Sequence, residues 1–596
     1  MNAHAQPFLV HAARTAEERS FQAHDGTQIF FRKWAAPLHQ PRRGTAILLH
    51  RGHEHSARLE HLIDEKAFEG MDIYAWDARG HGRSEGARGG APDFGTLVRD
   101  LDTFARHIVD ADGVDLDETS LVAQSVGAVI AATWVHDYAP PIRAMVLAVP
   151  AFDVNLVVPF ARPALSIWQK LRGPFTVRSY VDGKMLSSDA KRAASYDSDP
   201  LVSRAIASNV LMDLHATAER VVTDAGAITV PTQVLLAGAD KVVRPEAAHH
   251  FFDNLGTARK ERHGFPGLRH DILGEPDRAP VLAAIDGFLR GCIERPVAAP
   301  DLTRADREGY TKDEATSLSL PLPSLSPRRL TWAATRAAIR VGSHLSNGLR
   351  IGRKTGFDSG TMLDYVYRNR AEGTGPLGRL IDRTYLDSIG WRGIRQRKVH
   401  AEEIITLALA RLAEQGMPAH LVDIAAGHGR YVLEALDTAD RKPDSILLRD
   451  YCPRNVASGS ELIAAKRLSD IARFEQGDAF DGDSLAALDP RPTLAIVSGL
   501  YELFPENAPV QASLDGLARA VPAGGLLVYT GQPWHPQLEM IARTLTSHRD
   551  GQPWVMRRRT QAEMDALVAR AGFRKIEQRI DPWGIFTVSL AVRVAS

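Results

Sequence analysis

The sequence contains few cysteines, carries no net charge and has no long apolar run. Its 596 residues include two cysteines, Cys292 and Cys452. Two are too few for a disulfide framework or a cysteine-based zinc site, so we expect a reducing environment and no metal. Lys plus Arg and Asp plus Glu both number 72, and the formal net charge is +0. Because nucleic-acid-binding domains are usually basic, we expect no nucleic-acid partner.

Membrane-spanning and secretory segments are also not expected. A spanning helix needs roughly 18 or more apolar residues, and the nearest candidate, "MVLAVPAFDVNLVVPF" at 145–160, is interrupted by Asp153 and Asn155. The first twenty residues lack the apolar core of a signal peptide. We therefore expect a cytoplasmic chain, with at most peripheral contact at the inner membrane surface.

The length predicts two to four domains, since domains commonly have roughly 100–200 residues. After a tail at 1–20, residues 21–295 alternate short apolar runs such as "TAILLH" with amphipathic stretches. This pattern predicts a doubly wound α/β domain. Residues 152–215 interrupt the pattern and predict a helical cap. Residues 361–596 alternate again, so the predicted fold class is α/β with two domains, the second of them Rossmann-like.

Two segments join the predicted domains. Residues 296–330 are rich in Pro, Ser, Thr and charge and predict a linker. Residues 331–360 predict a basic connecting helix, and no acidic residue occurs from 328 to 354. One interpretation is a solvated basic helix packed on its neighbour. The other is an interfacial helix that contacts anionic lipid headgroups through 328–354.

The stretch "SLVAQSVGAV" at 120–129 places a serine between an apolar run and a helix-like segment. Ala123-Gln124-Ser125-Val126-Gly127 approximates the G-x-S-x-G elbow that exposes a nucleophilic serine. Such folds order their triad Ser, Asp, His. Asp240 follows the apolar run "TQVLLAG", and His270 lies in "HGFPGLRHDIL". Each could instead be an ordinary turn, cap or surface residue; the alternative histidines 249, 250 and 263 fall on a predicted helix or strand.

The segments "YAWDARGHGRSEGARG", "VAQSVGA", "GADKVV" and "GLRHDIL" resemble the monoacylglycerol lipase and lysophospholipase group of α/β hydrolases, also called the serine aminopeptidase S33-like set. The resemblance covers about residues 21–295 and implies an α/β-hydrolase fold, the catalytic residues Ser125, Asp240 and His270, and a lipid or small carboxylic ester as substrate. Serine peptidase activity is the runner-up.

The oxyanion loop departs from that family's pattern. The family usually has H-G-x-G-E-H-S, whereas this chain has His50-Arg51-Gly52-His53-Glu54-His55-Ser56. The resemblance implies that the N–H groups of Gly52 and Val126 form the oxyanion hole. Arg51 and His53 replace two glycines, so this loop departs from the family's pattern at two positions.

The second half contains "HLVDIAAGHGRY", in which a predicted strand ends at Asp423 and Gly427 and Gly429 follow. Glycines let the backbone approach a ligand closely. The third glycine of the dinucleotide fingerprint is absent, because position 432 is valine, which favours S-adenosylmethionine over a dinucleotide. Asp450 and Asp478 end the next two predicted strands, where acids can accept hydrogen bonds from ribose and adenine. Each could also be an ordinary strand-end turn residue.

Residues 361–596 resemble class I S-adenosylmethionine-dependent methyltransferases, and more closely a bacterial "putative methyltransferase" family. The motifs are "YLDSIGWRGIRQRK", "DIAAGHGRY", "RDY", "SGLYELFPEN" and "TGQPWHPQLE". The resemblance implies S-adenosyl-L-methionine as cofactor. The expected contacts follow the four strand ends: Asp423, Ala425, Gly427, Gly429, Asp450, Tyr451, Asp478, Ala479 and Ser498.

The methyl acceptor is the least defined part. The Asn/Asp-Pro-Pro-Tyr motif of DNA amino-group methyltransferases is absent from "SGLYELF" at 498–504. Tyr501, Glu502 and residues 533–535 are acceptor-pocket candidates or core residues. Arg392, Arg395 and Arg397 could bind an anionic acceptor or form a surface patch.

Three hypotheses follow from these patterns. The first is a bifunctional enzyme, an ester hydrolase fused to a methyltransferase that acts on a small or lipid acceptor. The second has a catalytic methyltransferase half and a hydrolase-like half that serves as a binding or scaffold module. The third is a membrane-surface interaction protein. The sequence determines neither natural substrate nor the oligomeric state.

Overall fold

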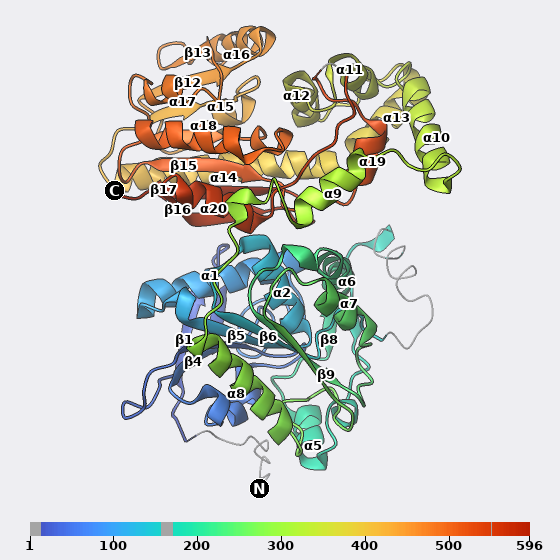
Figure 1. The fold of residues 1–596 in the computed structure, drawn as a ribbon, viewed down its shortest axis with the longest axis vertical. Helices are drawn as coiled ribbons and strands as arrows, with labels where there is room; N and C mark the ends of the chain where they lie inside the picture. Colours follow the sequence, from blue (N-terminus) through green and yellow to red (C-terminus); the bar gives the residue numbers. More distant parts are fainter. Residues whose placement is uncertain (1–12, 156–167, 169–170, 550, 596) are drawn as a thin grey trace. The chain divides into compact units, whose positions relative to one another are not determined.

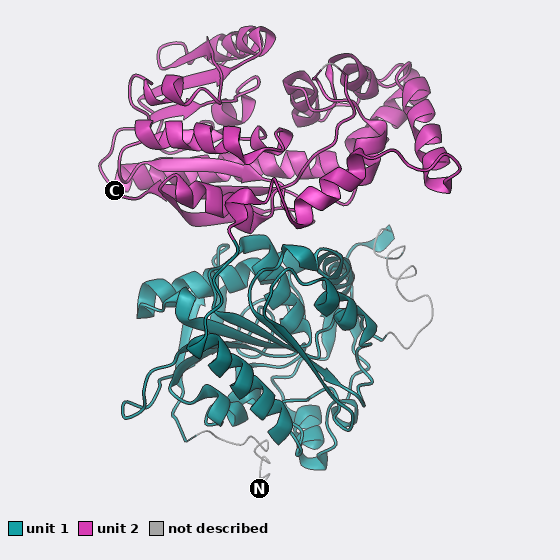
Figure 2. Ribbon diagram, in the orientation of Figure 1, with its two compact units in different colours: residues 1–300 teal, residues 301–596 magenta. Residues whose placement is uncertain are grey.

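The computed structural model describes residues 13–155, 168, 171–549 and 551–595. The chain divides into two units, Met1–Pro300 and Asp301–Ser596 (Figure 2). Each unit has its own central sheet. Among the described residues, no helix combines the length and the apolar character needed to cross a membrane.

Unit 1 is built on an eight-stranded sheet (Figure 1). In spatial order the strands are β1 (Glu17–Gln22), β2 (Gln28–Trp34), β4 (Met71–Trp76), β3 (Gly44–Leu49), β5 (Thr119–Gln124), β6 (Ala144–Ala148), β9 (Thr232–Ala237) and β10 (Lys260–Phe265). β2 runs antiparallel to both of its neighbours, and all other pairs are parallel. Strands β3 to β6 are buried along their whole length, which explains their continuous apolar sequences.

Helices cover this sheet, and smaller elements follow β6. The helices are α1 (Phe94–Asp112), α2 (Val126–Tyr138), α4 (Gly183–Leu186), α5 (Ala190–Ser198), α6 (Ser208–Thr223), α7 (Glu246–Asn254) and α8 (Ala279–Glu294). α8 packs against β6, β9 and β10, whereas α1, α2 and α6 pack on one another. The cap expected at 152–215 contains α4, α5, the start of α6 and the two-stranded ribbon β7 (Thr176–Arg178) and β8 (Ala205–Ala207). Its residues 156–167, 169 and 170 lie outside the described residues.

Unit 2 is built on a seven-stranded sheet. In spatial order the strands are β13 (Ala472–Gln476), β12 (Ser445–Asp450), β11 (His420–Asp423), β14 (Leu494–Val497), β15 (Leu526–Gly531), β17 (Thr587–Arg593) and β16 (Phe573–Ile580). β17 is antiparallel to β15 and β16, and the other pairs are parallel. The order reverses between β11 and β14, and ligands bind at such a switch point, beside the carboxyl ends of the strands.

Both faces of this sheet are covered. The helices of unit 2 are α9 (Tyr310–Ser319), α10 (Pro327–Gly342), α11 (Asn347–Thr355), α12 (Gly360–Arg368), α13 (Gly375–Leu386), α14 (Ile389–Glu414), α15 (Arg430–Ala435), α16 (Pro453–Ala465), α17 (Gly482–Ala486), α18 (Asn507–Ala520), α19 (Leu538–Thr544) and α20 (Gln561–Arg570). Leu421 packs in the core with α14, and its neighbour Val422 packs in the core with α18 and α20. Side chains of successive strand residues point to opposite faces, so an apolar strand serves two cores.

The connecting segments differ from the sequence-based expectation. β1 begins at Glu17, inside the expected tail 1–20, and α9 lies inside the expected linker 296–330. Polar contacts hold this segment on unit 2: Asn507 Nδ2 donates to the Thr303 carbonyl (3.1 Å) and Arg557 Nη1 to Thr311 Oγ1 (3.0 Å). This segment has the composition of a linker, but side-chain hydrogen bonds hold it against the rest of unit 2.

The expected single helix at 331–360 is two helices, α10 and α11. Ser346 interrupts the helical path because its hydroxyl accepts from the backbone N–H of Leu349 at 3.1 Å and caps α11.

Candidate active sites

Ser125 lies on a sharp turn between β5 and α2. Its backbone is in the left-handed region (φ 52°, ψ −116°), which is unfavourable for a residue with a side chain and is found at functional turns. Gly127 makes the turn possible, because a Cβ there would lie 2.5 Å from the carbonyl oxygen of His50. The sequence 123–127 therefore forms a tight elbow that presents the serine hydroxyl beyond the end of the sheet.

The structure brings Ser125, His270 and Asp240 together. His270 Nε2 lies 2.9 Å from Ser125 Oγ, and His270 Nδ1 lies 2.8 Å from Asp240 Oδ2. Asp240 Oδ1 accepts from the N–H groups of Val242 (2.7 Å) and Val243 (3.1 Å). Burial raises the pKa of Asp240, but the hydrogen bond and charge of His270 outweigh it, so the pKa is lowered and the carboxyl stays ionised.

The alternative histidines lie elsewhere. His249 and His250 are on α7, and His263 is on β10, where its Nε2 faces Glu261 at 3.2 Å.

The two expected oxyanion donors are neighbours. A Cβ on Gly52 would lie 3.0 Å from Val126 Cγ2, so a side chain at position 52 would crowd the Ser125 elbow. Within the described residues, neither the Gly52 N–H nor the Val126 N–H has a backbone acceptor, as expected of oxyanion donors. His53, one of the two glycine replacements, keeps a positive φ of 74°. The loop thus retains the turn that glycine would provide, at a cost in backbone strain.

The other replacement, Arg51, takes part in a buried ion network that the sequence motifs did not indicate. Its Nε and Nη2 donate to Glu54 at 2.9 and 2.6 Å, and its Nη1 lies 3.2 Å from Asp271 Oδ1. Asp271 follows His270 directly and also accepts from Arg192. The side chains of Arg51, Glu54 and Asp271 are at most 3% exposed. Arg51 therefore ties the oxyanion loop to the loop that carries His270.

The segment "D-x-x-G-H-G", the most specific part of the resemblance, has a structural role here. Asp77 Oδ1 accepts from the backbone N–H of Ser56 at 2.6 Å, and Oδ2 accepts from that of Arg83 at 2.8 Å. A Cβ on Gly82 would lie 2.1 Å from Asp77 Oδ2, so only glycine fits. The motif holds two loops together rather than contacting Ser125.

In unit 2 the expected cofactor residues follow the carboxyl ends of neighbouring strands. Asp423 ends β11 and is fully buried; its oxygens accept from the Ala425 N–H (3.1 Å) and the Tyr431 hydroxyl. Burial raises the pKa of Asp423 to about 7, against the effect of these hydrogen bonds. Gly427 and Gly429 both have positive φ, and no atom lies within 4 Å of the position where Gly427 would carry a Cβ. The loop is therefore open on the side where a ligand would approach.

Asp450 ends β12 and organises this loop. Its Oδ2 accepts from the Gly427 N–H, and its Oδ1 accepts from the Cys452 N–H and from Asn455 Nδ2, each at 2.9 Å. The neighbouring Tyr451 is 75% exposed. After β13, Asp478 is exposed and Ala479 is buried, and Ser498 follows β14 directly. The expected contacts thus gather along one edge, although the Asp450 carboxylate is already shared with protein donors.

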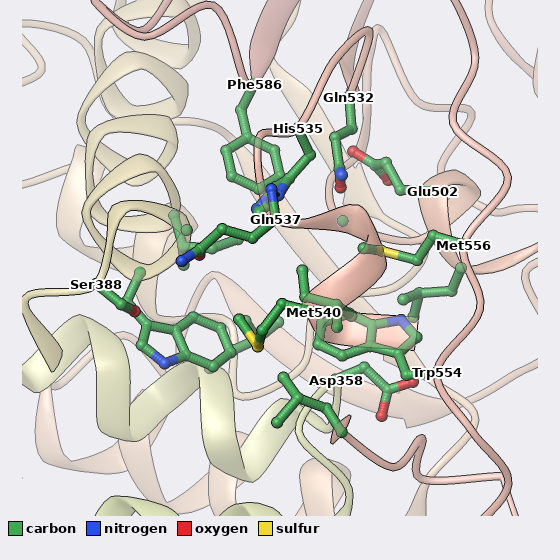
Figure 3. A pocket seen from close by; sticks show the side chains of 18 of the residues that line it. Asp358, Ser388, Glu502, Gln532, His535, Gln537, Met540, Trp554, Met556 and Phe586 are labelled. Atoms are coloured by element: carbon green, nitrogen blue, oxygen red, sulfur yellow. Dashed lines mark hydrogen bonds between the residues drawn. The ribbon is translucent and has the colours of Figure 1, made fainter. Parts of the chain in front are cut away.

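A largely apolar cavity of about 160 Å³ lies within unit 2 (Figure 3). Its walls come from α10, α11, α12, α13, α14, α19 and the segments after β14 and β15. Glu502, Gln532 and His535 lie on one side, and Asp358, Met540 and Trp554 on the other (Figure 3). Burial lowers the pKa of His535 to about 4, so this imidazole is neutral near pH 7. An apolar lining with a few polar groups is typical of a small-molecule site.

Some of the residues predicted to contact the methyl acceptor line this cavity, and others do not. Glu502, His535 and Arg397 line it. Tyr501 does not; it is buried and donates to Ser513 Oγ at 2.9 Å. Arg392 stacks on Trp583, and Arg395 donates to the Leu386 carbonyl, so neither lines the cavity.

The signal that could have found the cavity was spacing. Trp391, Ile394 and Arg397 recur every three residues on one side of α14, and all three line the cavity.

In the described part of the chain, no group of three or more His, Cys, Asp or Glu side chains could hold a metal ion.

Family models match both units. The model described as "Putative methyltransferase" matches residues 285–593, which is more than half of the chain. This chain belongs to that putative methyltransferase family. The model described as "Serine aminopeptidase, S33" matches residues 40–277. Together they identify this member of the putative methyltransferase family as a fusion of a hydrolase-type and a methyltransferase-type domain.

Two curated proteins and one solved structure are similar to all or part of this chain. The uncharacterized protein YnbC of Escherichia coli K12 is 52% identical over 98% of this chain and 99% of its own length. Monoacylglycerol lipase of Mycolicibacterium smegmatis is 27% identical over 46% of this chain and 97% of its own. The crystal structure of Paleococcus ferrophilus monoacylglycerol lipase is 25% identical and covers 44% of this chain and 99% of its own, with a TM-score of 0.40.

Proposed function

We propose that this chain is a bifunctional enzyme whose unit 1 is a serine hydrolase of lipid or small carboxylic esters and whose unit 2 is an S-adenosylmethionine-dependent methyltransferase. The observation that carries the first half is the hydrogen-bonded chain Ser125, His270, Asp240, beside the Gly52 and Val126 N–H groups, which have no backbone acceptor in the described part of the chain. The lipases among the relatives favour an ester over a peptide bond.

The geometry supports an acyl-transfer mechanism. His270 Nε2 takes the proton as Ser125 Oγ attacks the ester carbonyl, and Asp240 holds the imidazole and stabilises its charged form. The N–H groups of Gly52 and Val126 would bind the oxyanion. His270 then gives the proton to the leaving alcohol, and water releases the acid by the reverse steps.

A fluorophosphonate probe followed by peptide mass spectrometry tests this half. We expect an adduct on Ser125 that is lost in Ser125→Ala and in His270→Ala. His263→Ala, a change of a part-exposed histidine on β10, is the matched control and should keep the adduct. If native full-length protein is not labelled but still binds S-adenosylmethionine, unit 1 is a scaffold and the second hypothesis replaces the first.

For unit 2, the strand-end residues fit S-adenosylmethionine. The open side of the Gly427 turn leaves room for it, and Asp450 and Asp478 are carboxylates at the positions suited to its ribose and adenine. Bound there, S-adenosylmethionine would supply an electrophilic methyl group. Isothermal titration of the whole chain should show one site, and no heat of binding would remove the methyltransferase half of the proposal.

One surface favours peripheral membrane contact as a second role. On α10, Leu330 and Val341 are 66% and 67% exposed, eleven residues apart and therefore on one face. Arg329, Arg336 and Arg340 lie beside them and are exposed. Exposed apolar groups flanked by arginines suit anionic headgroups.

Sedimentation tests this second role. The protein should sediment with phosphatidylglycerol vesicles but not with phosphatidylcholine vesicles, and Leu330→Ser/Val341→Ser should abolish this. Leu38→Ser, at a fully exposed leucine of unit 1, is the control. Equal sedimentation of the double variant would exclude this face.

A further inference from the structure

Several buried polar atoms at one side of the unit 2 cavity have no hydrogen-bond partner among the described residues. Glu502 Oε1 accepts from Thr530 Oγ1 at 2.7 Å, whereas no described residue hydrogen-bonds its Oε2. In the same part of the chain, Arg397 Nε and Gln532 Nε2 have no partner either. These three residues are 9%, 3% and 5% exposed. A buried polar atom without a partner is costly, which makes this end of the cavity a place for a ligand's polar group.

The charges at this end cancel. Arg397 Nη1 lies 3.8 Å from Glu502 Oε1, and the neighbouring His535 is neutral near pH 7 because burial lowers its pKa to about 4. The other carboxylate that lines the cavity, Asp358, is already bonded to Ser547 Oγ and the His548 N–H, each at 2.6 Å. A carboxylate ligand would face Glu502 and an ammonium ligand would face Arg397. A neutral group avoids both repulsions.

The three free atoms also define the hydrogen bonds that this group must make. Arg397 Nε and Gln532 Nε2 donate, and Glu502 Oε2 accepts. A hydroxyl can accept the first two and donate to the third, whereas an ether or ketone would leave Glu502 Oε2 unpaired. The rest of the lining is mainly aliphatic and aromatic, including Leu349, Trp391, Ile541, Leu545 and Phe586.

The cavity is close to the expected methyl-transfer edge. Gly499 and Glu502 follow Ser498 in the segment after β14. A Cβ on Gly499 would lie 2.8 Å from Arg397 Nη2, so Arg397 lies beside the segment that follows β14 as well as on the cavity wall.

We propose that this cavity binds an apolar molecule with one neutral hydroxyl group, held between Glu502, Arg397 and Gln532. Its assignment as the methyl acceptor rests on the proposed function, whereas its existence as a binding site does not. The class is an apolar alcohol or phenol rather than a fatty acid, an amine or a nucleotide.

The test compares three probes with the same ten-carbon chain and different head groups: decan-1-ol, decanoate and decylammonium. Each competes with a photoreactive diazirine analogue of decan-1-ol on the full-length protein, and mass spectrometry locates the cross-links. We expect cross-links on cavity residues such as Trp554 and Met540, and at least tenfold stronger competition by decan-1-ol than by the two ions. Cross-links elsewhere, or decanoate as the strongest competitor, would overturn the proposal.

Two charge-neutralising variants, of which Glu502→Gln keeps the side-chain shape, separate a ligand contact from a purely structural role. Glu502→Gln leaves the Arg397 charge uncompensated and should raise the relative competition by decanoate at least tenfold. Arg397→Gln should do the same for decylammonium. Glu506→Gln, at an exposed glutamate four residues along, is the control and should change neither. A variant that weakens all three probes equally would point to a structural role.

Failure of this proposal and failure of the proposed function give different results. Binding of S-adenosylmethionine without any cavity cross-link would leave the methyltransferase assignment standing and remove this acceptor. Cavity cross-links without binding of S-adenosylmethionine would leave the binding site standing and remove both the methyltransferase assignment and the identification of its ligand as the methyl acceptor.

Discussion

Replacing Asp271 with asparagine tests whether the buried ion network holds the hydrolase site together. Asp271 accepts from Arg192 and lies 3.2 Å from Arg51 Nη1. Burial raises its pKa, but the charges of Arg192 and Arg51 outweigh burial and lower the pKa overall, so the group is ionised near neutral pH. Asparagine keeps the shape and removes only the charge.

The expected loss of stability follows from the charges that remain. Removing one partner of a buried ion pair typically costs about 3–5 kcal/mol, because a charge is left uncompensated. The amide oxygen can still accept one hydrogen bond and Arg51 keeps Glu54, so we expect about 3 kcal/mol. A depressed carboxyl pKa stabilises the folded state above the unfolded-state pKa and is lost as pH falls through the folded-state value. The difference between the wild type and Asp271→Asn should therefore begin to shrink below about pH 4 and should vanish only below the lowered folded-state pKa of Asp271.

Urea-dependent hydrogen exchange with mass spectrometry measures the loss of stability for each unit separately. Peptides from β5 and α2 should lose about 3 kcal/mol of opening free energy, and peptides from unit 2 should not change. Asp253→Asn removes an exposed carboxylate that pairs with Arg262, and it should cost less than about 1 kcal/mol. A loss below about 1 kcal/mol in Asp271→Asn would refute the reasoning, as would an equal loss in both units.

Three further predictions follow from single sites. In Gly127→Ala the new Cβ would lie 2.5 Å from the His50 carbonyl oxygen, so fluorophosphonate labelling should slow at least ~10-fold. The control is Gly287→Ala on α8, where no atom lies within 4 Å of the new Cβ, and this variant should be labelled at the normal rate. Asp450→Ala removes the acceptor for the Gly427 and Cys452 N–H groups and should weaken S-adenosylmethionine binding by about 1–3 kcal/mol in calorimetry; unchanged affinity would mean that another acid holds the ribose. Asp423 has a folded-state pKa raised to about 7, so its stabilising contribution is complete below pH 4 and is lost as pH rises through 7. In hydrogen exchange the stability of unit 2 should fall over this window in the wild type, and a fall of the same size in Asp423→Asn would contradict the assignment.

Much of the arrangement of both candidate sites was predictable because the candidate residues lie next to strand ends. An apolar run followed by a small-residue turn predicts where a parallel strand stops, and Ser125, Asp240, Asp423 and Asp450 all lie just there. The spacing of glycines was informative for the same reason: Gly127 and Gly429 each occupy positions where a Cβ would collide with a neighbouring strand or loop.

The linker and the connecting helix were predicted less well. The composition of residues 296–330 indicated a solvated linker, yet Thr303 and Thr311 are held by Asn507 and Arg557, which are 204 and 246 residues away along the chain. A hydrogen bond between such distant residues leaves no periodic trace in the sequence.

The sequence by itself determined the two α/β units, the polar residues that follow their strands and the candidate triad, because hydrophobic periodicity and turn chemistry are local properties. Only the tertiary structure decided that Arg51 replaces a glycine by joining a buried network with Glu54 and Asp271. Likewise, only folding brings Arg397, Glu502 and Gln532 from three separate segments to one end of an apolar cavity. Charge compensation and shared burial depend on distances between remote residues, which the sequence does not contain.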